Sequence, residues 1–167
     1  MVRNRTLCLA LTIAVLSCLP ASAAMARGSA TATMAVSVEV TANCTVAAGS
    51  LAFGTVTAAQ APAQTATAAI EVACGPDVAF TVELDDGQNG GNGTRRARDP
   101  ATGRSIGYEI FADPAHTRRW GSLDTQSVAS VADGNGTERL TAYGVIVGDG
   151  QVAAGSYGDL VTVTTNF

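Results

Sequence analysis

Few side chains in this 167-residue chain are of types that could carry out chemistry. The single histidine, His116, would have to serve in any serine–histidine–aspartate triad, yet it lies in a polar turn between Asp113 and Arg119. No serine is expected on a nucleophile elbow of the G-x-S-x-G type, in which a strand turns sharply into a helix. We therefore expect His116 to be a surface residue, and we predict no enzymatic activity and no cofactor.

Oxygen-bearing side chains gather in one Gly- and Asn-rich segment, at Asp85, Asp86, Asn89 and Asn92. Such groups are the usual ligands of Ca²⁺, but their spacing is not that of an EF-hand or a repeat. A solvated turn is the simpler interpretation, so no metal is predicted. Asp85 and Asp86 also make a poor glycosidase pair, because neighbouring positions at a strand end point apart.

The one tryptophan and the charge balance say little about ligands. Trp120 could stack on a sugar, but a lone tryptophan before a glycine is more typical of a core or a turn. The chain has a net charge of −4 and no lysine, and its one basic cluster is Arg95, Arg96 and Arg98. We therefore expect no nucleic-acid partner.

The N-terminus has the pattern of a signal peptide. Arg3 and Arg5 precede a mostly apolar run over residues 7–19, and small residues fit an A-x-A cleavage rule after Ala23 or Ala26. The run is too short for a spanning helix. A lipoprotein signal ending at Cys18 fits less well. We predict that residues 1–26 are removed, that the protein is secreted, and that the mature chain is one domain.

Export simplifies the cysteine chemistry. Cys8 and Cys18 leave with the signal peptide, so Cys44 and Cys74 have a single possible pairing in an oxidising compartment. Closing a loop of about thirty residues should stabilise the fold by roughly 3–4 kcal/mol. Two cysteines without nearby histidines or further cysteines are a poor metal site.

The elements that would position these residues are strands. Apolar residues alternate with polar or small ones, which places them on one face of a strand. The alternating runs cover residues 34–40, 70–74, 78–84, 106–110 and 161–167. Residues 140–147 are apolar on both faces and predict a central strand, while residues 55–67 form a loose strand or a connection. By parity Cys44 and Cys74 should face the core from the first two regular strands.

Turn signals rich in Gly, Asn, Asp and Pro separate these runs, which predicts an all-β antiparallel sandwich. About six strands follow Cys44. The alternating strand before it carries Met34, Val36, Val38 and Val40 on one face. That extra strand could belong to its own sheet or could complete a neighbour's sheet.

The order of several short motifs resembles the spore coat protein U family, which includes subunits of archaic, Csu-type chaperone–usher pili. The motifs run through most of the mature chain: Asn43-Cys44-Thr45-Val46, Leu51-Ala52-Phe53-Gly54, Val72-Ala73-Cys74, Phe80-Thr81-Val82-Glu83-Leu84, Ile106-Gly107-Tyr108-Glu109-Ile110-Phe111, Trp120-Gly121, Ala142-Tyr143-Gly144 and Gly155-Ser156-Tyr157-Gly158-Asp159-Leu160-Val161.

The resemblance implies an immunoglobulin-like sandwich that lacks its last strand, over residues 43–167, preceded by a donor-strand extension over residues 27–42. A periplasmic chaperone would lend a strand until the next subunit replaced it with its own extension, a form of β-augmentation. The donor residues would be Met34, Val36, Val38 and Val40, and the groove would be bordered by the C-terminal strand with Val161, Val163 and Phe167.

The resemblance also implies a function. The chain would be a structural subunit of a secreted surface fibre, exported through the periplasm and an outer-membrane usher, and serving adhesion and biofilm formation. Neighbouring pilus subunits would be its partners, and it would have no small-molecule substrate. Two alternatives stay open at this point: a secreted monomeric carbohydrate-binding sandwich, and a coat-layer protein that uses the same strand exchange.

Overall fold

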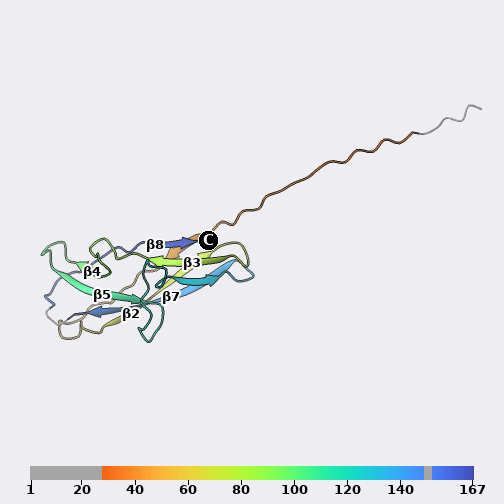
Figure 1. Ribbon diagram of the computed structural model, residues 1–167. Helices are drawn as coiled ribbons and strands as arrows, with labels where there is room; N and C mark the ends of the chain where they lie inside the picture. The colour runs from red at the N-terminus through yellow and green to blue at the C-terminus, as the bar shows by residue number, and fades with distance from the viewer. Residues whose placement is uncertain (1–27, 149–151) are drawn as a thin grey trace, which may run out of the picture. The chain divides into compact units, whose positions relative to one another are not determined.

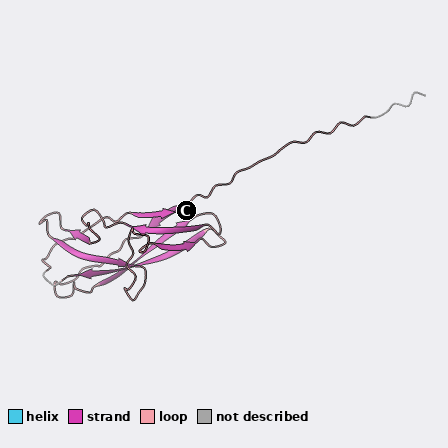
Figure 2. Cartoon of the chain, viewed as in Figure 1, coloured by secondary structure: helices cyan, strands magenta, loops and turns pink. Residues whose placement is uncertain are grey.

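The computed structural model describes residues 28–148 and 152–167, so the predicted signal peptide lies outside the described residues. The chain divides into two units, Met1–Val38 and Glu39–Phe167. In the first unit, residues 28–38 are extended and form no ladder with the described strands (Figure 1). Their side chains are exposed. The described residues contain strands and loops but no helix (Figure 2), and accordingly no helix among them could cross a membrane.

The described part of the second unit contains eight strands in two antiparallel sheets, whose arrangement Figure 1 shows. Their bounds are β1 Thr45–Ala48, β2 Thr65–Ala73, β3 Ala79–Leu84, β4 Arg95–Arg98, β5 Ser105–Phe111, β6 Val128–Val131, β7 Thr137–Val147 and β8 Val163–Asn166. One sheet has the order β1-β2-β7-β5-β4 and the other β6-β3-β8. The predicted all-β, immunoglobulin-like sandwich is confirmed.

The central strand was predicted where the structure has it. β7 pairs with β2 on one side and with β5 on the other, so it is the middle strand of the larger sheet. Its inward residues Ala142 and Ile146 are buried, whereas Tyr143 and Val145 on the outer face are half-buried. A central strand tends to carry apolar residues on both faces, because both faces are partly shielded from water.

The core lies between the sheets and is built from the alternating apolar residues. Val82 of β3 is fully buried, and Ile70, Tyr108 and Ile110 pack near it from the other sheet. Trp120 is 1% exposed, and its indole N–H donates to the Val82 carbonyl at 2.9 Å. Trp120 is thus a core residue, as its sequence context favoured, because its one polar group finds a partner inside.

A buried arginine connects the two sheets. Arg95 of β4 is 1% exposed. Its guanidinium donates to the carbonyls of Leu84 at 3.0 Å, Asp85 at 2.8 Å and Trp120 at 2.8 Å. Burial lowers the pKa of Arg95, while Glu109 opposes this from 3.8 Å. The cluster Arg95, Arg96 and Arg98 therefore contains one internal cross-link and two exposed side chains.

Some expectations about strands were wrong. Residues 34–40 have the predicted alternation but pair with none of the strands that the structure describes, so Cys44 does not continue a regular strand from Met34. The short strands β1, β4 and β6 were not predicted. β1 is the short run Thr-Val-Ala-Ala, and β4 carries three arginines, so neither shows a clear apolar alternation. The ambiguous segment 55–67 is a connection up to Gln64 and then enters β2.

Candidate functional site

An apolar groove opens between the two sheets. It encloses about 730 Å³. Its floor is the inner face of the larger sheet, with Ile70, Tyr108 and Ile110, and one wall is the segment after β1, with Leu51 and Phe53. The opposite wall is residues 157–163 together with the start of β8. The floor residues are buried, whereas Leu51, Phe53, Val161 and Val163 on the walls are half-buried, so an extended peptide would add its contacts chiefly along the walls.

The groove runs along an unpaired strand edge. Among the described strands, β8 pairs with β3 alone and β1 pairs with β2 alone, so each has one edge without a partner there. Just before β8, the Leu160 carbonyl accepts from Gln88 N–H at 3.0 Å and the Thr162 carbonyl accepts from Asp85 N–H at 3.1 Å. Within the described part of the chain, the backbone groups of Asp159 and Val161 have no such partner. Alternate backbone groups of this wall can therefore pair with an added strand.

Only some of the residues predicted to border or fill the groove lie in it. Val161 and Val163 line it. Phe167 does not line it and is 59% exposed. The four residues predicted for the donor strand are 86–87% exposed, and they are Met34, Val36, Val38 and Val40. Exposed apolar side chains in a row on one face of a strand are uncommon unless something covers them.

Polar contacts hold the groove wall in position. The Tyr108 hydroxyl donates to Asp159 Oδ2 at 2.8 Å, and Asp159 Oδ1 accepts from the Asn89 side-chain amide at 2.9 Å. Burial, together with this carboxylate, raises the pKa of Tyr108 well above its ordinary value, so the hydroxyl stays a donor. Asp159 thereby ties the C-terminal wall to both the larger sheet and the loop after β3.

The acidic loop is structural. Asp85 Oδ1 accepts from Gly87 N–H and from Thr162 N–H, each at 2.9 Å. Burial acts to raise the pKa of Asp85, but these hydrogen bonds outweigh it and the pKa is lowered. Asp86 instead accepts from Gly93 N–H at 2.8 Å and pairs with Arg119 at 3.2 Å. The prediction of a merely solvated turn was thus incomplete, because both carboxylates fasten neighbouring segments.

The described residues hold no group of three or more His, Cys, Asp or Glu arranged for a metal ion. His116 is half-buried against Phe111, with ring centroids 5.2 Å apart.

The sequence of residues 103–107 does match the pattern G-x-S-x-G, contrary to our expectation that no such serine is present. However, Ser105 is the first residue of a strand, whereas an elbow serine lies on a turn from a strand into a helix.

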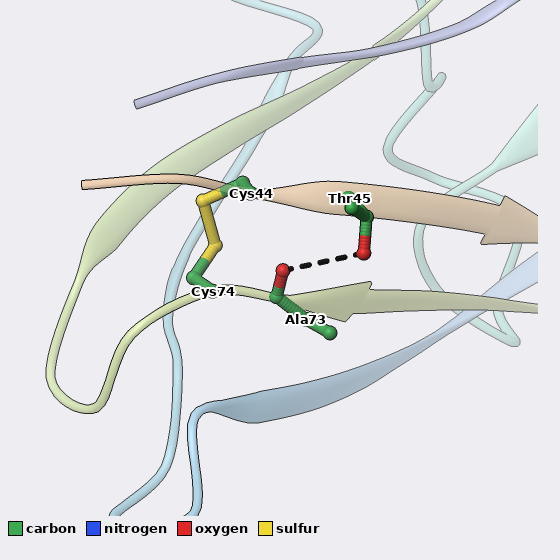
Figure 3. The surroundings of a disulfide bond; sticks show 4 residues. All are labelled: Cys44, Thr45, Ala73 and Cys74. Carbon is green, nitrogen blue, oxygen red and sulfur yellow. Dashed lines mark hydrogen bonds between the residues drawn. A yellow bond between two sulfur atoms is a disulfide. The ribbon is translucent and has the colours of Figure 1, made fainter.

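The predicted disulfide between Cys44 and Cys74 is present (Figure 3). Cys44 immediately precedes β1 and Cys74 immediately follows β2, so the bond joins neighbouring strands of one sheet. Beside it, the Thr45 hydroxyl lies 3.5 Å from the Ala73 carbonyl (Figure 3). Both cysteines are half-buried and Cys74 packs against the core, so the bond lies at its margin and not inside it.

The family model described as the Spore Coat Protein U domain matches residues 30–164. The chain belongs to this family. The resemblance noted from the sequence motifs is therefore confirmed. The match begins at residue 30, so the spore coat protein U domain includes most of the N-terminal extension as well as the sandwich. No curated protein sequence matches the chain.

A solved structure supports the same fold. The chain is similar to a chain in the crystal structure of the CsuC–CsuE chaperone–tip adhesion subunit pre-assembly complex, from archaic chaperone–usher Csu pili of Acinetobacter baumannii. The TM-score is 0.60 and the sequence identity 21%, over 77% of this chain. The match spans 40% of that longer chain. At this identity the likeness concerns the fold.

Proposed function

We propose that this spore coat protein U domain is a structural subunit of a secreted surface fibre assembled by donor-strand exchange. The N-terminal extension of one copy fills the groove of the next. A periplasmic chaperone and an outer-membrane usher handle the subunit before assembly, and the fibre serves adhesion and biofilm formation. The observation that carries the proposal is the apolar groove beside the free edge of β8.

The extension has the dimensions and side chains that the groove requires. Residues 34–40 span roughly 20 Å when extended at about 3.3 Å each. Their four apolar side chains, which we call the plug residues (Met34, Val36, Val38 and Val40), are on one face and exposed. Burying them would contribute on the order of 6–10 kcal/mol before ordering costs, an upper estimate. Backbone pairing with the free edge would add to this.

The need for a chaperone follows from the same geometry. An open apolar groove next to an unpaired strand edge promotes aggregation. A lent strand would cover both features during export. Signal-peptide removal after Ala23 or Ala26 would leave the extension, residues 27–42, free to act as the donor.

The experiment compares the mature chain with a donor-disabled chain carrying Val36→Asp and Val38→Asp. We expect the mature chain to form polymers that resist SDS, and the donor-disabled chain to stay folded without forming them, because a carboxylate in an apolar groove is costly. The matched control is Ser37→Asp, since Ser37 lies on the opposite face of the extension. Equal polymerisation of all three chains would refute the donor assignment.

A coat-layer protein is the second candidate, and the family's own description favours it. Such a protein would use the same groove and the same extension but would form a sheet-like deposit. Electron microscopy of the polymers distinguishes the two, because strand exchange along one axis gives thin fibres and further lateral contacts give layers.

A further inference from the structure

The groove ends beside an exposed arginine that the fold does not use. Arg98 of β4 lines a hollow of about 580 Å³ together with Asn89, Tyr157 and Gly158. Tyr157 and Gly158 also line the apolar groove, so the hollow continues it at this end. Among the described residues Arg98 has no ion-pair partner, in contrast to Arg95 and Arg119.

The backbone at this end already forms two adjacent strands. Arg98 N–H donates to the Gly158 carbonyl at 2.9 Å, and Gly158 N–H donates to the Arg98 carbonyl at 3.1 Å. The two residues are therefore a hydrogen-bonded antiparallel pair, and the positions of their side chains point to the same face. A Cβ added at Gly158 would meet no atom within 4 Å, so the space between Arg98 and the groove is open.

Next to the plug residues the extension carries a single charged side chain, since Arg27 lies seven positions before Met34. Between Gly28 and Asn43, Glu39 is the one ionisable side chain. It alternates with the plug residues, so it points away from the core when the plug residues point inward. Glu39 lies near the C-terminal end of the row of plug residues. The two possible directions of insertion would therefore bring its charge to opposite ends of the groove.

We propose that Glu39 of the inserted extension pairs with Arg98 of the receiving copy, across Gly158, and so fixes the direction and register of insertion. This inference rests on the proposed function. The extension then runs antiparallel to residues 157–163. Met34 lies opposite Val163, Val36 opposite Val161, and Glu39 opposite Gly158.

The distances permit the contact. In this register Arg98, Gly158 and Glu39 stand in a row across three adjacent strands. Neighbouring strands are about 4.8 Å apart, so the Cα atoms of Arg98 and Glu39 lie roughly 10 Å apart. A long arginine and a glutamate can meet over that span because Gly158 has no side chain between them. The inward positions also alternate correctly, since Val36 and Val161 then both face the core.

The opposite direction would lose this contact. A parallel insertion would carry Glu39 towards β8 and away from Arg98 and Gly158, so the ion pair can form in one direction only.

The test measures the affinity of a fluorescent peptide of residues 29–43 for the donor-disabled chain. We expect Arg98→Gln in the receiving chain to weaken binding about two- to fivefold, as for an exposed ion pair, and Arg98→Glu to weaken it further. A peptide with Glu39→Arg should recover the loss on the Arg98→Glu chain. The effect of Arg98→Gln should vanish in 1 M salt, where the screening length is about 3 Å.

The matched control is Arg96→Glu, which changes the same charge on the same strand and face, two residues away. It should leave the affinity unchanged. A loss with Arg96→Glu but not with Arg98→Glu would overturn the proposed register, and equal affinities for all these chains would overturn the ion pair. Failure of the native peptide to bind even the chain with Arg98 intact would instead refute the proposed function.

Discussion

Filling the groove from its floor should block strand insertion without unfolding the domain. Ala68 of β2 lines the groove, is half-buried and lies on the same face of the strand as the buried Ile70. In the variant Ala68→Phe, the ring would take the place of one valine of the incoming extension. Excluding one valine costs about 1.5–3 kcal/mol of burial, and this corresponds to a roughly ten- to hundredfold loss of affinity.

The assay is peptide binding to the donor-disabled chain, with a thermal melt of each variant to verify folding. Thr67→Phe is the matched control, because Thr67 precedes Ala68 on β2 but is exposed on the outer face, opposite Tyr143. We expect Thr67→Phe to bind the peptide normally. If folded Ala68→Phe binds as tightly as the parent chain, or if both variants lose affinity equally, then the groove is not the acceptor.

Three further predictions concern the framework of the groove. Arg95→Met should lower the free energy of unfolding by about 3–5 kcal/mol in urea titrations, because three buried carbonyls lose their donor. A loss under 1 kcal/mol would show that the cross-link is dispensable. Replacing Cys44 and Cys74 by serine should cost roughly 3–4 kcal/mol for their sequence separation of 30, whereas an unchanged melting temperature would contradict this. The pKa of Asp85 is lowered on folding, so its stabilisation is complete at neutral pH and is lost as the pH falls below about 4. Melting temperatures should fall there, and less steeply in Asp85→Asn; identical profiles would exclude this role.

The strands that the sequence predicted well are those with long apolar alternation. β3, β5 and the central β7 are found where period-two patterns occur, because burial on the inner face demands apolar residues at every second position. The disulfide was also predictable, since the predicted removal of a signal peptide leaves two cysteines with one possible partner each. These features depend on local pattern and on composition.

What could not be predicted depends on contacts distant in sequence. The three arginines of β4 look alike in the sequence, yet Arg95 is buried because Leu84, Asp85 and Trp120 present carbonyls to it. Similarly, Asp85 looks like a turn residue until Thr162 is brought to it from 77 positions away. The local sequence pattern around Arg95 or Asp85 contains no information about these distant hydrogen-bond partners.

In the N-terminal extension, by contrast, the local pattern is clear but the pairing partner is missing. Its alternation predicts a strand, and the residues are extended, but they pair with no strand in residues 28–148 or 152–167. A strand needs a neighbour for its backbone hydrogen bonds. If the neighbour is another copy, the pattern is correct and the partner is simply absent from a single chain.

The most direct test of this account is the oligomeric state of the purified mature protein with and without the residues up to Thr41. The account predicts SDS-resistant polymers, or a stable complex with the chaperone, for the full mature form. The shortened form should stay monomeric and should accept the peptide of residues 29–43. If both forms were stable monomers and neither bound the peptide, strand exchange through this groove would be contradicted.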